Sequence, residues 1–368
     1  MKPTVVLFGP SLSAVSGVST HLNQLFGSAI ASELHLLHFQ VGSEGKAETA
    51  LTKLARFLWS PFQLAIFLCR RRPDIVHLNS SLERKAFWRD FVYLLVSRLC
   101  RRPVVLQIHG GYLPEVFCAG SPILSAIVRR ALSMTETIVL LAESERVAYS
   151  RFVPGVHIRV VANAIDVGPS LAGAKADLRR GENLKLVYVG RLATEKGISE
   201  AIEAIDILRR EGVDVSFKIA GAGPAEGELR DRVSMLGLAD RVQFLGAVFG
   251  DDKDDLWLEA DVFVFPTFHV EGLPYALLES MAARTIPVTC PVGGIPDVMQ
   301  DEVHGLFVPP HEPAAVAAAI LWIHENRAAA RAMGEAARDR ILDAYTVTRL
   351  ADDFRSIYNE VLGATCAD

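Results

Sequence analysis

The strongest constraint on the fold is a regular alternation of short apolar runs with longer amphipathic helical stretches. The runs expected to form strands are 4–9, 34–39, 74–79, 103–109, 137–142 and 157–162 in the first half, and 184–190, 216–221, 242–246, 262–266, 286–290 and 305–309 in the second. Strands that alternate with helices pair in parallel, because each crossover helix must pack on a face of the sheet. The sequence therefore predicts an α/β protein with two doubly wound sheets.

The stretch 166–183 separates the two series of strands. It loses the apolar periodicity and is rich in glycine, alanine and charged residues, which is typical of a linker. We expect a first domain at 1–165, the linker at 166–183, a second domain at 184–345 and a terminal helical segment at 346–368. Ligands of doubly wound sheets bind beyond the carboxyl ends of the strands. We therefore expect the two domains to face each other across a ligand-binding cleft.

The two halves of the chain differ in charge. Residues 1–170 carry 18 Lys and Arg against 11 Asp and Glu, a net of +7, and the other residues carry 20 against 32, a net of −12. This asymmetry indicates two domains with different neighbours, although chance sorting of surface charge gives the same pattern. Five widely spaced cysteines indicate reduced thiols, and the N-terminus lacks the features of a signal peptide. We expect a cytoplasmic protein without a nucleic-acid partner.

Residues 51–69 are the stretch that suggests membrane contact. Lys53, Arg56 and Pro61 interrupt this apolar and aromatic segment, so its unbroken part is too short to span a bilayer. Three arginines follow at 70–72, and an apolar helix with a basic flank can lie in the plane of the lipid headgroups. A core helix beside a solvated arginine cluster is the alternative. The other basic residues of the first half favour membrane contact slightly.

Two glutamates, Glu271 and Glu279, lie eight positions apart where a predicted strand passes through a Gly-Leu-Pro turn into a helix. Pro274 suits the first turn of that helix, because the missing N–H costs little there. The backbone N–H groups around Gly272 and Leu273 and the positive end of the helix dipole form an anion site. An anion site beside hydroxyl-binding carboxylates suits a sugar nucleotide.

The loop 189–198 follows another predicted strand and carries Arg191 and Lys196. Two cations there would neutralise a leaving diphosphate, since charge-assisted hydrogen bonds to phosphate are strong. Alone, such a loop is usually a solvated surface, but its combination with the two glutamates favours phosphate binding. The acidic run at 250–257 is interpreted as a helix start, where aspartates interact with the helix dipole, and not as a metal site.

The first half contributes a glycine loop and several histidines. Gly17 follows the first strand where the chain bends into a helix, and its backbone can approach a phosphate closely. The loop is not a GxGxxG fingerprint, so a dinucleotide cofactor is less favoured than a nucleotide sugar. His109 ends a predicted strand and could hydrogen-bond a sugar hydroxyl, with a structural histidine as the alternative. His77 is expected to be structural, and His21 is a weaker candidate for shaping the cleft.

Together these segments resemble the retaining GT-B glycosyltransferases of the large bacterial family that includes phosphatidylinositol mannosyltransferase and exopolysaccharide enzymes (glycosyltransferase family 4). The resemblance covers nearly the whole chain. Its most specific part is the E-x7-E motif of Glu271 and Glu279, combined with VGRLATEKG at 189–197 and ADVFVFPT at 260–267. The first loop departs from the family pattern, because Ser16 stands where the first of two paired glycines is usual.

The resemblance implies a GT-B fold of two Rossmann-like domains and roles in the second one. Arg191 and Lys196 would grip the diphosphate, Glu271 would contact the transferred sugar, and Glu279 would contact the ribose.

The resemblance also implies roles for Gly17, whose N–H would reach phosphate, and for His109, which would bond the sugar near its O6. The backbone around Gly246 and Val248 would read the base edge. The terminal helix would pack back on the first domain.

The implied reaction moves a sugar from a nucleoside diphosphate to an acceptor hydroxyl, with retention and without a metal or other cofactor. A UDP-sugar is the first choice of donor and GDP-mannose the second. The expected acceptor is a lipid-linked saccharide at the inner membrane face, used in polysaccharide or glycoconjugate synthesis. Two alternatives stay open: a GT-B sugar-nucleotide epimerase, and a catalytically inactive partner subunit that binds a nucleotide.

Overall fold

The computed structural model describes residues 2–42, 49–168, 171 and 183–365. Most of the predicted linker, at 169–170 and 172–182, lies outside the described residues.

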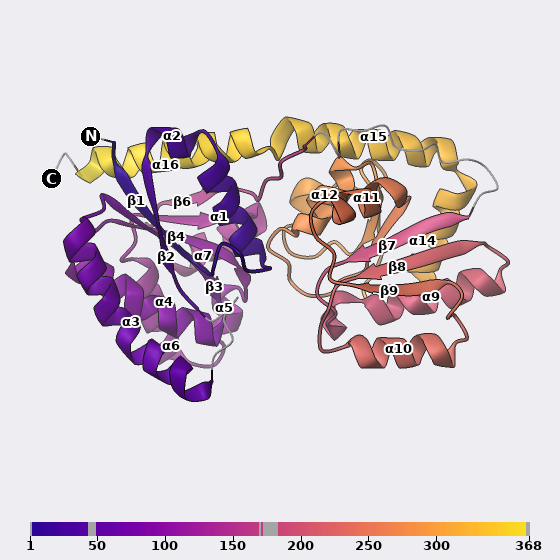
Figure 1. The fold of residues 1–368 in the computed structure, drawn as a ribbon, viewed down its shortest axis with the longest axis horizontal. Helices are drawn as coiled ribbons and strands as arrows, with labels where there is room; N and C mark the ends of the chain where they lie inside the picture. Colours follow the sequence, from indigo (N-terminus) through magenta and orange to yellow (C-terminus); the bar gives the residue numbers. More distant parts are fainter. Residues whose placement is uncertain (1, 43–48, 169–170, 172–182, 366–368) are drawn as a thin grey trace. The chain divides into compact units, whose positions relative to one another are not determined.

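The chain divides into two compact units, which are shown as ribbons in Figure 1. The first unit comprises Met1–Ala164 together with Val347–Asp368, and the second comprises Ile165–Thr346. Each unit contains one parallel sheet with helices packed on it.

The sheet of the first unit has six parallel strands in the order β2-β1-β3-β4-β5-β6. The chain passes from β1 to β2 on one side and returns to β3 on the other, so the topological switch point lies between β1 and β3. The strands are β1 (Thr4–Gly9), β2 (His35–Gln40), β3 (Ile75–Leu82), β4 (Val104–Gly111), β5 (Thr137–Leu140) and β6 (Ile158–Val160). The helices are α1 (Gly17–Gly27), α2 (Ile30–Glu33), α3 (Ala50–Arg71), α4 (Arg84–Leu99), α5 (Pro114–Phe117), α6 (Pro122–Leu132), α7 (Glu143–Phe152) and α16 (Val347–Thr365).

The sheet of the second unit has six parallel strands in the order β12-β11-β10-β7-β8-β9, with its switch point between β7 and β10. The strands are β7 (Leu184–Val189), β8 (Val215–Ala220), β9 (Val242–Gly246), β10 (Val262–Phe265), β11 (Ile286–Thr289) and β12 (Leu306–Phe307). The helices are η1 (Thr194–Lys196), α9 (Ile198–Arg210), α10 (Glu226–Met235), α11 (Asp251–Glu259), α12 (Tyr275–Ala282), α13 (Ile295–Val298), α14 (Pro313–Glu325) and α15 (Arg327–Ala344).

These sheets confirm the predicted α/β class with two doubly wound sheets. All twelve predicted strands are present, with ends that differ by a few residues; β4, for example, continues through Gly111 instead of ending at His109. The periodicity of an apolar run fixes the middle of a strand better than its ends, because the end depends on what the neighbouring strand offers for pairing.

Strand β1 shows how the first sheet is buried on both faces. Val5 and Leu7 belong to a core cluster with residues of α1 and α16, while Val6 and Phe8 belong to a cluster with residues of α3, α4, α6 and α7. Figure 1 shows α1, α2 and α16 on one side of this sheet and α3, α4 and α6 on the other. Successive side chains of a strand point to opposite faces, so a strand buried on both faces is apolar throughout.

Helix α16 closes one face of the first sheet through a polar contact as well as apolar packing. The hydroxyl group of Tyr358 lies 2.6 Å from Nδ1 of His77, and Nε2 of His77 lies 3.1 Å from Oε1 of Gln107. Because the amide oxygen of Gln107 only accepts, Nε2 carries the proton and Nδ1 accepts from Tyr358. His77 is therefore a satisfied structural histidine, as the sequence predicted.

Two histidines of this layer are neutral at pH 7. His21 of α1 and His77 are both fully buried. Burial lowers the pKa of His21 well below its ordinary value, and burial lowers the pKa of His77 to about 3. Protonation of either ring would place an uncompensated charge in the core.

We predict that the first unit loses stability as the pH falls from 7 to 5. An unfolded histidine binds a proton with a pKa of about 6.5, whereas the folded His77 stays neutral down to about 3. The unfolded state therefore binds more protons, and unfolding becomes easier by about 1.4 kcal/mol per pH unit for each such histidine once the pH is below 6.5. Urea unfolding at several pH values measures this slope, and the His77→Gln variant should reduce it. Equal stability at pH 5 and pH 7 would contradict the prediction.

Candidate functional site

The predicted phosphate loop and the predicted carboxylate loop meet at one edge of the second sheet. The loop with Lys196 follows β7, and the loop with Glu271 follows β10, its parallel neighbour at the switch point. The ammonium group of Lys196 donates to Oε1 of Glu271. The two side chains are only 16% and 13% exposed. A pair with so little solvent around it interacts more strongly than an ion pair on an open surface.

Two neighbours fix this ion pair in place. The buried hydroxyl group of Thr267 lies 3.2 Å from Oε1 of Glu271 and 3.2 Å from the backbone oxygen of Glu195. The ammonium group of Lys196 lies 5.9 Å from the ring centre of Phe265, within the range of a cation–π attraction. Lys196 and Glu271 are therefore positioned before any ligand binds, which reduces the entropy lost on binding.

Two glycines allow the loops to approach so closely. A Cβ atom on Gly293, whose φ is +58°, would lie 1.8 Å from the backbone oxygen of Glu271. That oxygen also accepts a hydrogen bond of 2.9 Å from the N–H of Gly294. On the other loop, a Cβ atom on Gly197, whose φ is +73°, would lie 2.1 Å from the backbone oxygen of Pro266. Only glycine combines a positive φ with such close backbone contacts.

Glu279 lies on α12 and is held by two residues of α11. Its Oε1 accepts from the ammonium group of Lys253 at 2.7 Å, and its Oε2 accepts from the indole N–H of Trp257 at 3.2 Å. Glu279 is 14% exposed. The predicted helix start at 250–257 is confirmed by α11, which has three aspartates in its first turn. Lys253 and Trp257 were not among the predicted site residues, although both lie within this acidic run.

Arg191 lies in the same loop as Lys196 but differs in its surroundings. Its side chain is exposed, and its backbone oxygen accepts a hydrogen bond of 2.8 Å from the hydroxyl group of Tyr188. Burial and the nearby Glu271 carboxylate raise the pKa of Tyr188, so this hydroxyl group keeps its proton. Within the part of the chain that the structure describes, the guanidinium group makes no ion pair with Glu271. Its grip on a diphosphate stays a prediction.

The start of α12 differs slightly from the sequence prediction. Pro274 is the N-cap residue and Tyr275 is the first helical residue, so the proline precedes the first turn. Leu273 is buried and Gly272 is partly exposed. Pro274 has no N–H, so the donors at this helix start come from its neighbours. Burial raises the pKa of the Tyr275 hydroxyl group.

Gly246 and Val248 lie where the chain leaves β9 and approaches α11. Gly246 ends β9 with a φ of +69°, and its backbone oxygen accepts a hydrogen bond of 2.7 Å from the N–H of Gly221. Val248 is partly exposed in the loop that follows. The predicted contact of this segment with a base edge stays a prediction.

The first unit holds the other two predicted site residues. Nε2 of His109, near the carboxyl end of β4, lies 2.7 Å from Oδ1 of Asn79. Gly17 is the exposed first residue of α1, and the Ser16 side chain caps that helix by accepting from the N–H of Ser19 at 3.3 Å. His21 lies beneath His109, with ring centres 4.9 Å apart. His109 is thus oriented by its neighbours, while its contact with a sugar stays a prediction.

Solved structures of glycosyltransferases share this two-sheet architecture. The chain superimposes with a TM-score of 0.74 and 16% identity on Anabaena HepE, solved in complex with UDP-glucose, over 97% of this chain and 99% of that one. At this identity the likeness establishes the fold, which is GT-B.

Residues 174–340 match the family model for glycosyl transferases group 1. The second unit thus carries a glycosyl transferases group 1 domain, which confirms the resemblance inferred from the E-x7-E motif. It is 28% identical over 286 residues to the alpha-D-kanosaminyltransferase of Streptomyces kanamyceticus, covering 74% of each chain. It is 30% identical over 250 residues to a GDP-mannose-dependent alpha-(1-6)-phosphatidylinositol monomannoside mannosyltransferase of Mycobacterium tuberculosis, covering 64% of each chain.

We predict that Gly293→Ala lowers sugar-transfer activity by about tenfold or more, because the new methyl group displaces the backbone of Glu271 and hence its carboxylate. Gly237→Ala is the matched control: Gly237 also has a positive φ, +65°, but a Cβ there meets no atom within 4 Å. Steady-state rates and melting temperatures of both variants separate misplacement from general strain. Equal activity of the two variants would show that the Gly293 contact does not position Glu271.

Proposed function

We propose that this chain transfers a glycosyl group from a nucleoside diphosphate sugar to an acceptor hydroxyl, with retention of the α configuration. The observation that carries the proposal is the Lys196–Glu271 pair at the start of α12, where a cation and a carboxylate are held ready for a diphosphate and a sugar. Glu279, held between Lys253 and Trp257, is the group proposed to bind the ribose hydroxyls.

In the proposed reaction, the bond between the anomeric carbon and the diphosphate oxygen breaks while the acceptor oxygen approaches the same face of the sugar. The acceptor proton passes to the departing diphosphate, and the nucleoside diphosphate leaves. Lys196 and Arg191 stabilise the charge that develops on the diphosphate, which is the main catalytic term expected for such a step. Because these cations perform this task, we propose that the reaction needs no metal or other cofactor.

A UDP-sugar is the first proposed donor and GDP-mannose the second. The structural neighbour from Anabaena was solved with UDP-glucose, and the name of the mycobacterial relative specifies GDP-mannose. The loop at Gly246 and Val248 is proposed to recognise the base through its backbone, so the side chains alone do not distinguish the two donors.

A thermal-shift screen of UDP- and GDP-sugars identifies the donor. The reaction is then run with the preferred donor in the presence of EDTA, and NMR of the product should show an α-linked sugar. A new sugar nucleotide formed without any acceptor would instead indicate an epimerase. Stabilisation by a nucleotide sugar without any donor hydrolysis or transfer would indicate an inactive partner subunit.

We predict that Lys196→Ala lowers turnover by about tenfold or more, equivalent to about 1.4 kcal/mol of transition-state stabilisation. Lys218→Ala is the control, because Lys218 pairs with Glu259 at 2.8 Å on the exposed surface of the same unit. Single-turnover rates with saturating donor measure the effect, and circular dichroism checks the fold. Near-normal turnover of Lys196→Ala would remove this lysine from the leaving-group role.

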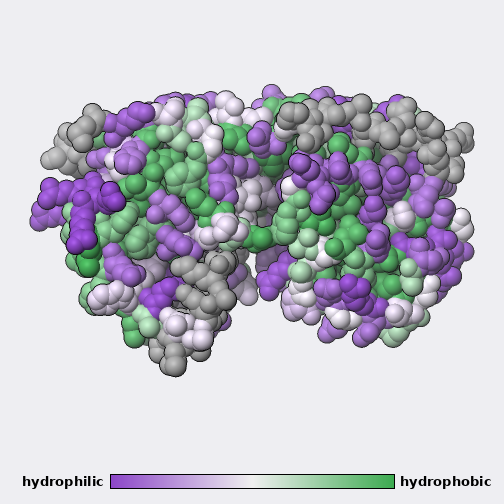
Figure 2. Space-filling model, in the orientation of Figure 1, coloured by the Kyte–Doolittle hydropathy of each residue, from purple (hydrophilic) through white to green (hydrophobic). Residues whose placement is uncertain are grey.

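We also propose that the acceptor is a lipid-linked saccharide used in polysaccharide or glycoconjugate synthesis. In this proposal α3 contacts the membrane surface. Leu58, Trp59, Phe62 and Ile66 share one face of α3 at helical spacing, and each is between 48% and 62% exposed. Figure 2 shows apolar side chains in green along the edge of the first unit where Figure 1 places α3. Among the described residues, no helix is long and apolar enough to cross a bilayer.

Basic residues follow directly on this apolar face, since α3 ends with Arg70 and Arg71 in its last turn. An apolar face with a basic end suits the headgroup region of an anionic bilayer.

We predict that the protein sediments with anionic liposomes more than with neutral ones, and that salt weakens this binding. The double variant Trp59→Ser and Phe62→Ser should abolish sedimentation, because it removes two aromatic side chains from the exposed face of α3. Met235→Ser is the control, since Met235 is 71% exposed on the second unit. Equal sedimentation with neutral and anionic liposomes would count against the proposal.

A further inference from the structure

The first unit contains a cavity of about 890 Å³ at the carboxyl edge of its sheet. Pro10 follows β1, Gly42 follows β2, Ser80 lies near the end of β3, and His109 lies near the end of β4; all four line the cavity. The cavity thus spans the switch point between β1 and β3, which is where doubly wound sheets bind ligands. The position of the cavity in the fold therefore favours ligand binding.

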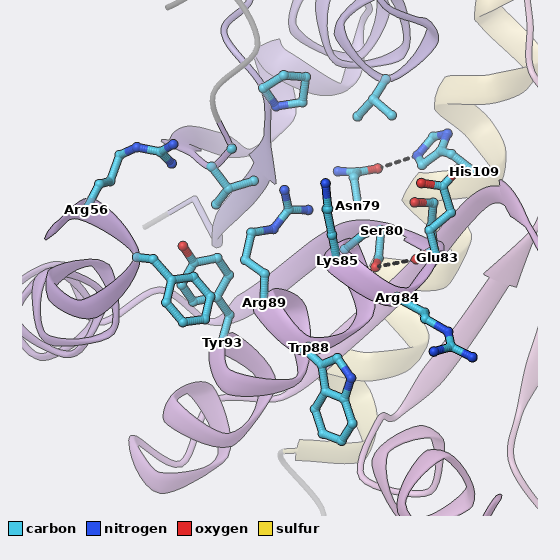
Figure 3. A pocket seen from close by; sticks show the side chains of 17 residues that line it. Arg56, Asn79, Ser80, Glu83, Arg84, Lys85, Trp88, Arg89, Tyr93 and His109 are labelled. Atoms are coloured by element: carbon cyan, nitrogen blue, oxygen red, sulfur yellow. Dashed lines mark hydrogen bonds between the residues drawn. The ribbon is translucent and has the colours of Figure 1, made fainter. Parts of the chain in front are cut away.

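The wall of this cavity is strongly basic. Four cations line it, Arg56, Arg84, Lys85 and Arg89, against one carboxylate, Glu83. In Figure 3, Lys85 and Arg89 point in the same direction from α4, and Arg84 points to the opposite side. Closely placed cations of this kind attract an anionic ligand.

Arg89 is held in a fixed orientation. Its Nε and Nη2 donate to the two carboxylate oxygens of Asp90 at 2.6 and 2.9 Å, and the hydroxyl group of Ser80 donates to Asp90 at 2.6 Å. Asp90 is only 6% exposed. The third nitrogen, Nη1, faces Gly42, where a Cβ atom would lie 3.2 Å away. A guanidinium group that is already oriented loses less entropy when it binds a phosphate than a free one does.

The other end of the cavity can bind a hydroxyl group, and Figure 3 shows the Glu83 side chain next to His109 there. In Figure 3, His109 and Asn79 lie at one end, Arg56 at the other, and Lys85 and Arg89 between them. The amide nitrogen of Asn79 donates to the backbone oxygen of Phe8 at 2.9 Å, so its Oδ1 accepts from Nε2 of His109. Burial lowers the pKa of His109 to about 3. The neutral ring therefore carries its proton on Nε2, and Nδ1 is an acceptor.

The basic end of the cavity continues into the apolar face of α3. Arg56 and Phe57 line the cavity, and Phe57 is 49% exposed. The next residues along α3, Leu58 and Trp59, belong to the exposed face described above. A ligand with an anionic group in the cavity can therefore extend an apolar chain over α3 without leaving the protein surface.

We propose that this cavity binds the acceptor and that the acceptor is a lipid phosphate. Its phosphate lies against Lys85, Arg89 and Arg56, its reactive hydroxyl group lies toward His109, and its alkyl chain lies along the exposed face of α3. The order of hydrogen-bonding, cationic and apolar surfaces along the cavity matches the order of saccharide, phosphate and lipid in such a molecule. This inference rests on the proposed function and names the class of acceptor.

The protein is titrated with phosphatidylcholine vesicles with and without dodecyl phosphate, and binding is followed by co-sedimentation with the vesicles. We expect Lys85→Gln to weaken binding by about tenfold or more, since it removes a charge-assisted hydrogen bond to the phosphate. Arg89→Gln should weaken it as well. Arg130→Gln, which removes an exposed cation of α6 outside the cavity, should leave binding unchanged.

Two further measurements decide whether the bound phosphate belongs to a lipid and whether it binds in this cavity. Inorganic phosphate and a soluble sugar phosphate should bind much more weakly than dodecyl phosphate; equal binding would overturn the lipid assignment. Unchanged binding in Lys85→Gln and Arg89→Gln would overturn the site itself. The thermal shift caused by the nucleotide sugar should be the same in Lys85→Gln and in the unmodified protein. A failure of the proposed function would instead appear as no nucleotide-sugar shift in the unmodified protein.

Discussion

The ion pair between Lys196 and Glu271 is the interaction on which the candidate donor site depends. Each side chain has little exposure to solvent, so each charge would be poorly compensated without the other. The pair forms because β7 and β10 are neighbours at the switch point of the second sheet, which brings the loops that follow them together. It is kept in place by close backbone contacts that only Gly197 and Gly293 permit. The position of the Lys196–Glu271 pair therefore depends on the strand order of the sheet and on the close approach of the two loops, as well as on the attraction between the charges.

The same topological rule organises the first unit. Its cavity opens where β1 and β3 diverge to different crossover connections, and residues at or just after the ends of four strands line it, while its cations come from α3 and α4. The two sites differ in charge: the second unit pairs its cations with carboxylates at Glu271 and Glu279, whereas the first unit surrounds its cavity mainly with cations. This difference follows the charge asymmetry of the sequence, and it suits a saccharide donor site in one unit and an anionic acceptor site in the other.

The likeness to known glycosyltransferases covers the fold and the domain of the second unit, and it leaves the acceptor open. Two relatives have names that specify different reactions, since one is an alpha-D-kanosaminyltransferase and the other a phosphatidylinositol monomannoside mannosyltransferase. The region with the family match, 174–340, lies in the second unit, where the donor site is proposed. The cavity and the exposed face of α3 lie in the first unit, outside that match. If the cavity binds the acceptor, as proposed, residues of the first unit select it.

The sequence by itself determined the twelve strands, the doubly wound class, the loops with Lys196 and Glu271, and the helix that carries Glu279. These features depend on short-range periodicity and on the position of polar residues directly after strands, both of which are visible along the chain. The tertiary structure alone decided that Lys253 and Trp257 hold Glu279, and that Asp90 orients Arg89 within the wall of a cavity. Such partners lie on helices whose apolar and charged faces give no information about which loop they will meet, because that choice depends on how the helix packs on its sheet.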